Sequence, residues 1–88
     1  MKIKDGFILR DIAGKTLVVA VGERSKSFRG MVTLNETGKY IWKILEKGAT
    51  KEEIVESILA EFEGADRLTV ENDVNTFISK LEGDNILE

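Results

Sequence analysis

The apolar residues of this 88-residue chain change their spacing once, near residue 34. Before that point they form short β-branched and aliphatic runs, and after it they recur at the three- and four-residue intervals of an amphipathic helix. A chain with this single switch has its strands first and its helices afterwards, and the helices must cover the apolar face of the sheet. The order therefore predicts an α+β fold.

The first part of the chain predicts three strands. Residues 7–12 and 15–21 are rich in β-branched and aliphatic side chains. The Ala13-Gly14 pair between them suits a tight hairpin turn, because Gly adopts a positive φ without strain. A polar loop then leads to a short apolar run over residues 31–34, which we expect to pair with the hairpin as a third antiparallel strand.

The second part of the chain predicts three helices. Asn35 and Thr69 stand where helix N-caps belong, and Thr50 and Glu53 have the spacing of a capping box. Each apolar stripe is followed by a glycine that favours a helix end, at Gly48, Gly64 and Gly83. The expected helices cover about residues 36–47, 51–63 and 70–82.

These elements fit one domain spanning residues 1–88, with the sheet inside residues 7–34. No Pro, internal repeat or long linker interrupts their order. The two short helix connections favour a helix-turn-helix arrangement. We therefore expect an α+β, winged helix-turn-helix-like domain, in which a three-stranded antiparallel sheet is followed by three helices.

Composition argues against catalysis. The chain contains no Cys and no His, so it lacks the usual ligands of zinc and the commonest general base. Its Gly residues form no phosphate-binding pattern, and no carboxylate pair stands beside a nucleophile. We expect no enzyme activity, no cofactor and no metal site.

The sequence also bears on location. The N-terminal residues lead directly into a strand-like run, so no signal peptide is expected, and no apolar run has the length of a membrane span. The lack of Cys suits a reducing compartment. These features predict a cytoplasmic chain with no membrane partner.

Charge is distributed unevenly along the chain. Residues 1–49 carry a net charge of +5 and residues 50–88 carry −8, within a total of −3. A winged-helix DNA-binding regulator is an alternative for this fold, but such a protein presents Lys and Arg to the phosphates. The second and third helices have few cations among many carboxylates. We therefore expect no nucleic-acid partner.

An ordered set of motifs runs through most of the chain, namely Leu34-Asn35-Glu36-Thr37-Gly38, Ile41-Trp42-x-Ile44-Leu45, Gly48-x-Thr50, Glu53-Ile54-Val55 and Phe62. In this order the chain resembles the PqqD-like family of winged-helix peptide-binding domains, over about residues 7–87. Members of that family are chaperone-like recognition elements. The resemblance implies non-catalytic binding of the leader segment of a ribosomally made precursor peptide, which is presented to a peptide-modifying enzyme, often a radical S-adenosylmethionine protein.

The resemblance also implies where the peptide binds, as a strand added to the third strand beside the third helix. A strand that starts after a loop and ends at a helix pairs with the hairpin on one side only, so its other edge offers unpaired N–H and C=O groups. Backbone pairing supplies affinity, and pockets for alternate side chains supply selectivity. The expected peptide-binding residues are Met31, Val32, Thr33 and Leu34 on the strand and Val74, Asn75, Ile78 and Ser79 on the helix.

The sequence leaves open which side chains of the third strand point toward the peptide. Alternation along a strand separates Val32 and Leu34 from Met31 and Thr33, but it does not show which pair meets the peptide. On the third helix, Phe77 is expected in the core rather than at the site.

The outer face of the sheet has alternative explanations. The second strand is apolar on both faces, and three helices can cover only one of them. We expect the outer face to be exposed or occupied; the alternatives are partial cover by the N-terminal segment, a second copy in a homodimer, and the modifying enzyme. A generic protein-interaction or dimerisation module is therefore the alternative function.

Duplex DNA tests the charge argument directly. Because the helices are acidic, we expect no gel shift with generic duplex DNA at physiological salt. Tight binding that weakens steeply as salt is added would show instead that the chain neutralises DNA phosphates and that the fold serves nucleic-acid recognition.

Overall fold

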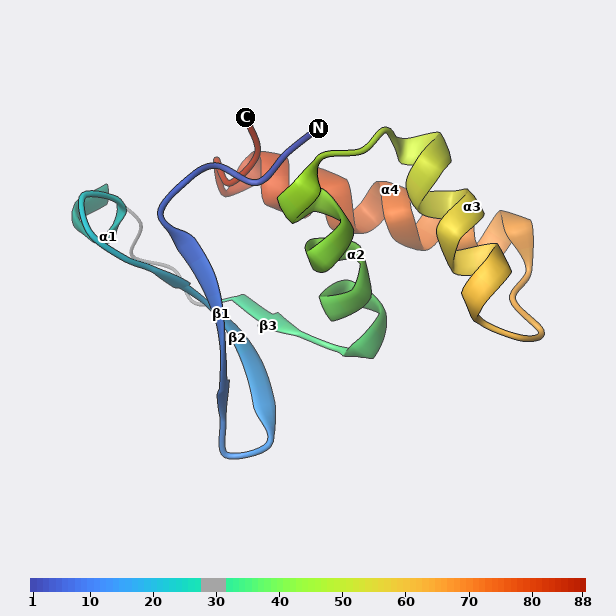
Figure 1. Cartoon of the computed structure of the whole chain (residues 1–88), viewed down its shortest axis with the longest axis horizontal. Helices are drawn as coiled ribbons and strands as arrows, with labels where there is room; N and C mark the ends of the chain where they lie inside the picture. The colour runs from blue at the N-terminus through green and yellow to red at the C-terminus, as the bar shows by residue number, and fades with distance from the viewer. Residues whose placement is uncertain (28–31) are drawn as a thin grey trace.

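The computed structural model describes residues 1–27 and 32–88, and it has the expected order of strands followed by helices (Figure 1). The α+β class is confirmed, because three antiparallel strands in the order β1-β2-β3 precede the main helices. The elements are β1 Phe7–Ile12, β2 Lys15–Ala20, α1 Arg24–Ser27, β3 Val32–Leu34, α2 Glu36–Lys47, α3 Lys51–Glu61 and α4 Arg67–Gly83.

The hairpin turn sets the register of the whole sheet. Ala13 and Gly14 have φ of 53° and 79°, so both central residues of the turn are left-handed, as a two-residue hairpin loop of the right twist requires. Ile12 then lies opposite Lys15. At the far end of the same ladder the Val21 N–H donates to the Gly6 carbonyl oxygen at 2.8 Å.

The helix caps decide where α2 and α3 begin. The Asn35 side chain accepts a hydrogen bond from the Gly38 N–H at 2.8 Å, as expected for an N-cap. The predicted capping box is also present: Thr50 Oγ1 accepts from the Glu53 N–H at 3.1 Å, and Glu53 Oε1 accepts from the Thr50 N–H at 2.9 Å.

The elements of the structure differ from the sequence-based expectations at several places. Helix α4 begins at Arg67 rather than at residue 70, because Asp66 is its N-cap and accepts from the Thr69 N–H at 3.1 Å. Helix α3 ends at Glu61 instead of residue 63, since Phe62 already has extended backbone angles. The polar loop contains a one-turn helix, α1, that the sequence did not indicate.

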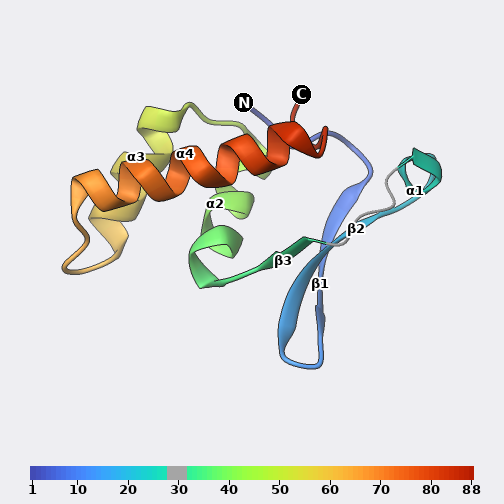
Figure 2. The ribbon, with the colours of Figure 1, turned by 180° about the vertical axis from the view of Figure 1, so that it is seen from behind.

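Helix α2 follows β3 and packs beside it, whereas α3 packs against α4 at the end of the domain away from the sheet (Figure 1). Helix α4 runs behind α2 and α3 in Figure 1 and in front of them in the reverse view of Figure 2. Alternate strand residues point toward these helices and are buried with them. The core includes Val18, Val32 and Leu34 from the sheet, Ile41, Trp42 and Leu45 from α2, Ile54 and Ile58 from α3, and Val74, Ile78 and Leu81 from α4.

The termini lie together and away from the outer face of the sheet (Figures 1 and 2). The Ile3 N–H donates to the Leu45 carbonyl oxygen at 3.1 Å, and the Glu88 N–H donates to the Lys2 carbonyl oxygen at 2.9 Å. The N-terminal segment therefore runs between the end of α2 and the C-terminal tail. The expectation that it covers the outer face of the sheet is wrong.

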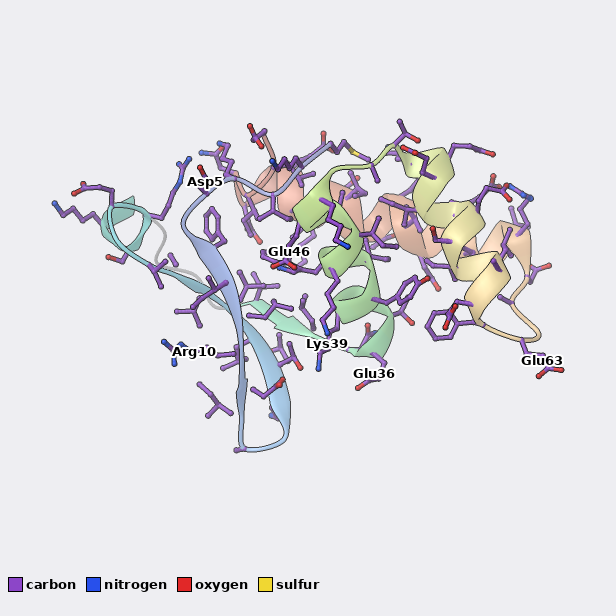
Figure 3. All side chains as sticks on the ribbon, in the orientation of Figure 1. Asp5, Arg10, Glu36, Lys39, Glu46 and Glu63 are labelled. Carbon is purple, nitrogen blue, oxygen red and sulfur yellow. The ribbon has the colours of Figure 1, made fainter. Side chains whose placement is uncertain are left out.

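The outer face of the sheet is instead exposed in the described part of the chain. Ile8 and Ile12 of β1 are 36% and 50% exposed. Arg10 lies between them on the same face and points away from the helices (Figure 3). The opposing residues of β2 on this face include Leu17 and Val19, which are half-buried.

None of the helices in the described ranges combines the length and the apolar character needed to cross a lipid bilayer.

Two aliphatic residues on neighbouring helices offer a matched test of this core. Ile58 of α3 is 4% exposed, whereas Leu68 of α4 is 67% exposed. We expect Ile58→Ala to lower the free energy of unfolding by about 2–4 kcal/mol, because buried atoms are lost and a cavity remains. Leu68→Ala should change it by less than about 0.5 kcal/mol. Urea denaturation measures both, and equal effects would contradict the burial of α3.

Candidate functional site

The candidate site begins at the free edge of β3. The Val21–Gly6 hydrogen bond and the two-residue turn show that residues 15, 17, 19 and 21 of the second strand bond to β1. Thr16 and Val18 therefore bond to β3, through their partners Leu34 and Val32. By the same alternation, the backbone N–H and C=O of Thr33 point away from the sheet.

The two faces of β3 differ sharply. Val32 and Leu34 are 3% and 6% exposed and belong to the core, whereas the Thr33 side chain is exposed on the outer face. The expectation that Val32 and Leu34 offer side chains to the peptide is corrected by their burial, and which face of β3 meets the peptide stays a prediction. Met31 lies outside the described residues, so its assignment to the edge stays a prediction.

A groove opens where β3 runs into α2. It has a volume of about 310 Å³ and lies between the first turns of α2 and one face of α4. Its apolar surface comes from Ile41 and Phe77, and hydroxyl, amide and charged groups surround them. We call this the α2–α4 groove; its lining residues are Asn35, Thr37, Gly38, Ile41, Asp73, Thr76, Phe77 and Lys80.

Gly38 allows α2 and α4 to approach each other at this groove. A Cβ atom at Gly38 would lie 3.2 Å from Cε1 of Phe77 and 3.6 Å from Cβ of Leu34. These distances bring the end of β3, the first turn of α2 and the middle of α4 to one point. A residue larger than Gly would push the Phe77 ring toward the groove or the helices apart.

The four α4 residues predicted to contact the peptide lie elsewhere. Val74 and Ile78 are 0% exposed, so the expectation that their side chains line the binding surface is corrected by their position in the core. Asn75 is exposed but lines a hollow between α3 and α4, and Ser79 is also exposed. A role for Asn75 or Ser79 in peptide binding stays a prediction.

The prediction placed the wrong face of α4 at the groove. The groove face of α4 carries Asp73, Thr76, Phe77 and Lys80, which follow the three- and four-residue spacing of one helix face. Phe77, expected in the core, is partly buried and lines the groove. One signal points to this face: Gly38 stands inside a helix, where Gly costs stability relative to Ala, and a close approach by another element is one reason for such a residue.

The charges along the groove are partly paired. Lys80 lies 3.6 Å from Asp84 on the same helix. Asp73 forms no ion pair with any residue in the ranges 1–27 and 32–88. The groove thus has a free carboxylate toward the start of α4 and a paired ammonium toward its end.

Arg67 links α3 and α4 through carboxylates of both helices. Its guanidinium is hydrogen-bonded to Glu56 and lies 3.9 Å from Glu52 and 3.8 Å from Glu71. The hydrogen bond to Glu56 and the nearby carboxylates raise the pKa of Arg67 above its ordinary value. The charge of Arg67 is therefore directed at these three carboxylates.

The described side chains form no group of three or more potential metal ligands. The site instead combines a strand edge with an adjoining groove. This arrangement can hold an extended peptide by its backbone and sort its side chains by shape and charge.

Comparison with known proteins supports this view of the fold. The sequence profile of coenzyme PQQ synthesis protein D (PqqD) matches residues 18–87, which is most of the chain. The chain belongs to the PqqD family. No curated protein sequence matches this PqqD-family chain.

Two solved structures resemble this PqqD-family chain. TbiB1 in complex with the TbiA(β) leader peptide is 33% identical, with a TM-score of 0.77, and the match covers 100% of this chain and 95% of TbiB1. Lasso peptide synthetase B1 complexed with the leader peptide is 15% identical, with a TM-score of 0.73, and the match covers 97% and 93%. The second likeness concerns the fold alone.

Two glycine substitutions test the close approach at the groove. We expect Gly38→Ala to lower the free energy of unfolding by about 0.5–2 kcal/mol, because the new methyl group crowds Phe77. Gly83→Ala is the control, since a Cβ there meets nothing within 4 Å. It should be neutral or slightly stabilising, because Ala is the better helix former. Urea denaturation and the ring resonances of Phe77 report both effects, and a neutral Gly38→Ala would contradict the packing described.

Proposed function

We propose that this chain binds the leader segment of a ribosomally made precursor peptide as a fourth strand on β3 and presents it to a peptide-modifying enzyme. The outward backbone edge at Thr33, next to the α2–α4 groove, is the observation that carries the proposal. TbiB1, the 33% identical structure, supports it, because that structure was solved with a leader peptide.

The ladder predicts how a guest strand lies on this edge. The guest residue opposite Thr33 exchanges hydrogen bonds with its N–H and C=O, and the side chain of that guest residue shares the outer face with Thr33. The guest residues on either side point to the inner face. There the α2–α4 groove, with Ile41 and Phe77, receives one of them.

This binding mode divides affinity from selectivity. The backbone contacts on β3 are independent of the guest sequence, so they contribute affinity for any extended segment without Pro at the paired position. The groove distinguishes guests through the fit of one side chain and through Asp73 and Lys80. Such a site selects a short motif within a leader and leaves the core of the precursor free.

The chain acts as a recognition element without chemistry of its own. Its groove offers hydroxyl, amide, carboxylate and ammonium groups on a wall suited to holding a peptide, and it has no His or Cys to activate a nucleophile. The reaction on the precursor then belongs to the partner, for which a radical S-adenosylmethionine enzyme is the expected class. We place the complex in the cytoplasm, where a ribosomally made precursor is released.

The outer face of the sheet stays accessible while a guest is bound. Ile8, Ile12 and Arg10 lie on the face opposite the groove, and a strand on the β3 edge would lengthen this face without covering it. A modifying enzyme can therefore contact this face and a bound leader together. A homodimer through the same face would compete with that contact.

Amide exchange on the labelled protein tests the proposal, with a synthetic leader from a precursor encoded beside the gene as the probe. We expect the leader to protect the Thr33 amide, because its N–H gains a strand partner, while the Val32 and Leu34 amides change little. Thr33→Pro removes the outward donor and should weaken binding at least about tenfold.

Thr33→Val is the matched control. It keeps the backbone N–H and a β-branched side chain, so it should bind the leader like the wild type. Urea denaturation of both variants checks that Thr33→Pro is folded. Protection confined to the hairpin turn at Ala13 and Gly14, with Thr33 unchanged, would contradict strand addition even if the leader bound tightly.

A further inference from the structure

A second hollow continues the α2–α4 groove toward the connection between α3 and α4. It has a volume of about 360 Å³ and shares Thr37 and Asp73 with the groove. We call it the connection pocket; its lining residues are Thr37, Ile58, Phe62, Gly64, Ala65, Asp66, Thr69, Val70 and Asp73. The two hollows are therefore adjacent, and a peptide that leaves β3 through the groove comes next to this pocket.

The floor of the connection pocket is apolar. Ile58 and Val70 are 4% and 6% exposed and form the base. Phe62, the residue directly after α3, is 39% exposed, and its ring stands nearly perpendicular to that of Tyr40 with centroids 5.1 Å apart. A large aromatic side chain that is held in place on one side and open on the other is suited to contact an apolar guest group.

The rim of the connection pocket is acidic. Asp66 and Asp73 both line it, and no Lys or Arg is among its described lining residues. Asp66 uses Oδ2 for both of its hydrogen bonds, to the N–H and the hydroxyl of Thr69, so Oδ1 is available to a guest. The nearest cation along the chain, Arg67, is engaged by the carboxylates on the other side of α4.

Only one of the two carboxylates has a structural role. Asp66 caps α4, but Asp73 lies more than a turn into the helix and has neither an ion-pair partner nor a cap to form in the described part of the chain. Glu63, in the same connection, points out into solvent (Figure 3). The acidic character is thus directed into the place where the groove and the pocket meet.

We infer that the connection pocket is a second subsite for the proposed peptide, which takes a large apolar side chain with a Lys or Arg beside it. The inference rests on the proposed leader binding and adds the chemical class of the recognised motif. The apolar side chain covers Phe62 and Val70, and the neighbouring cation lies between the carboxylates of Asp66 and Asp73. Leaders with an acidic residue at that place are rejected by like charge.

Selection from a random peptide library tests this subsite directly. Linear peptides displayed on phage are selected on the wild-type chain and on Asp73→Lys. We expect wild-type binders to carry an apolar residue next to Lys or Arg, and Asp73→Lys binders to carry Asp or Glu at the charged position. A synthetic peptide selected on the wild type should bind Asp73→Lys about three- to tenfold more weakly.

Glu82→Lys is the matched control. It makes the same change of charge on α4, nine positions further along, which is about two and a half helical turns and therefore the opposite side of the helix. Selection on Glu82→Lys should return the wild-type motif, and the synthetic peptide should bind it as tightly as the wild type. A motif that changes equally with both variants would overturn the inference, because it would reflect net charge alone.

The apolar part of the subsite has its own variant. Phe62→Ala should select peptides without the apolar preference, while these peptides still protect the Thr33 amide. If wild-type binders protect Thr33 but show no cationic preference, and Asp73→Lys selects the same peptides, the connection pocket is not a subsite and leader binding at β3 stands. If no binder protects Thr33, the proposed function fails and this inference fails with it.

Discussion

The structure depends on one close contact, at which the end of β3, the first turn of α2 and the middle of α4 meet. Gly38 makes this contact, since even a methyl group at this position would press on Phe77 and approach Leu34. The contact sets the distance between α2 and α4, and thus the width of the α2–α4 groove. Because protein interiors are closely packed, a small change in volume at Gly38 is transmitted directly to that groove.

The second constraint is the alternation of hydrogen bonding along β2, which the length of the hairpin turn decides. A two-residue turn at Ala13 and Gly14 places alternate residues of β2 in the ladder to β1, and leaves the others for β3. Val32 and Leu34 pair with β2, so this alternation leaves the backbone N–H and C=O of Thr33 pointing away from the sheet. One backbone position and the groove beside it therefore form the site that we propose for a guest peptide.

The acidic second half of the chain has two separate uses. Glu52, Glu56 and Glu71 gather around Arg67 and form ion pairs within and between α3 and α4. Asp66 and Asp73 face the opposite side of this helix pair, where the connection pocket opens. Charges that look alike in the sequence are thus divided by the helix geometry into a structural group and a group available to a ligand.

The order of amino acids is enough to tell which elements form and where most of them start. Local chemistry decides these features: left-handed turn residues make the hairpin, and the side chains of Asn35 and Thr50 cap the helices that follow them. The family is also evident at this level, through motifs that lie in order along the chain. The start of α4 escaped prediction because Asp66 and Thr69 are both good caps, and only the folded chain chooses between them.

The rotation of α4, in contrast, is settled by packing alone. Its apolar stripe shows which residues are buried, but the residues flanking that stripe on its two sides have similar polarity, so the sequence does not tell which flank faces β3. Packing against α3 and the close approach at Gly38 turn Asp73, Phe77 and Lys80 toward the groove, and put Val74 and Ile78 in the core. A side chain's place on a helix is a local property, whereas the partner it faces depends on every element packed around that helix.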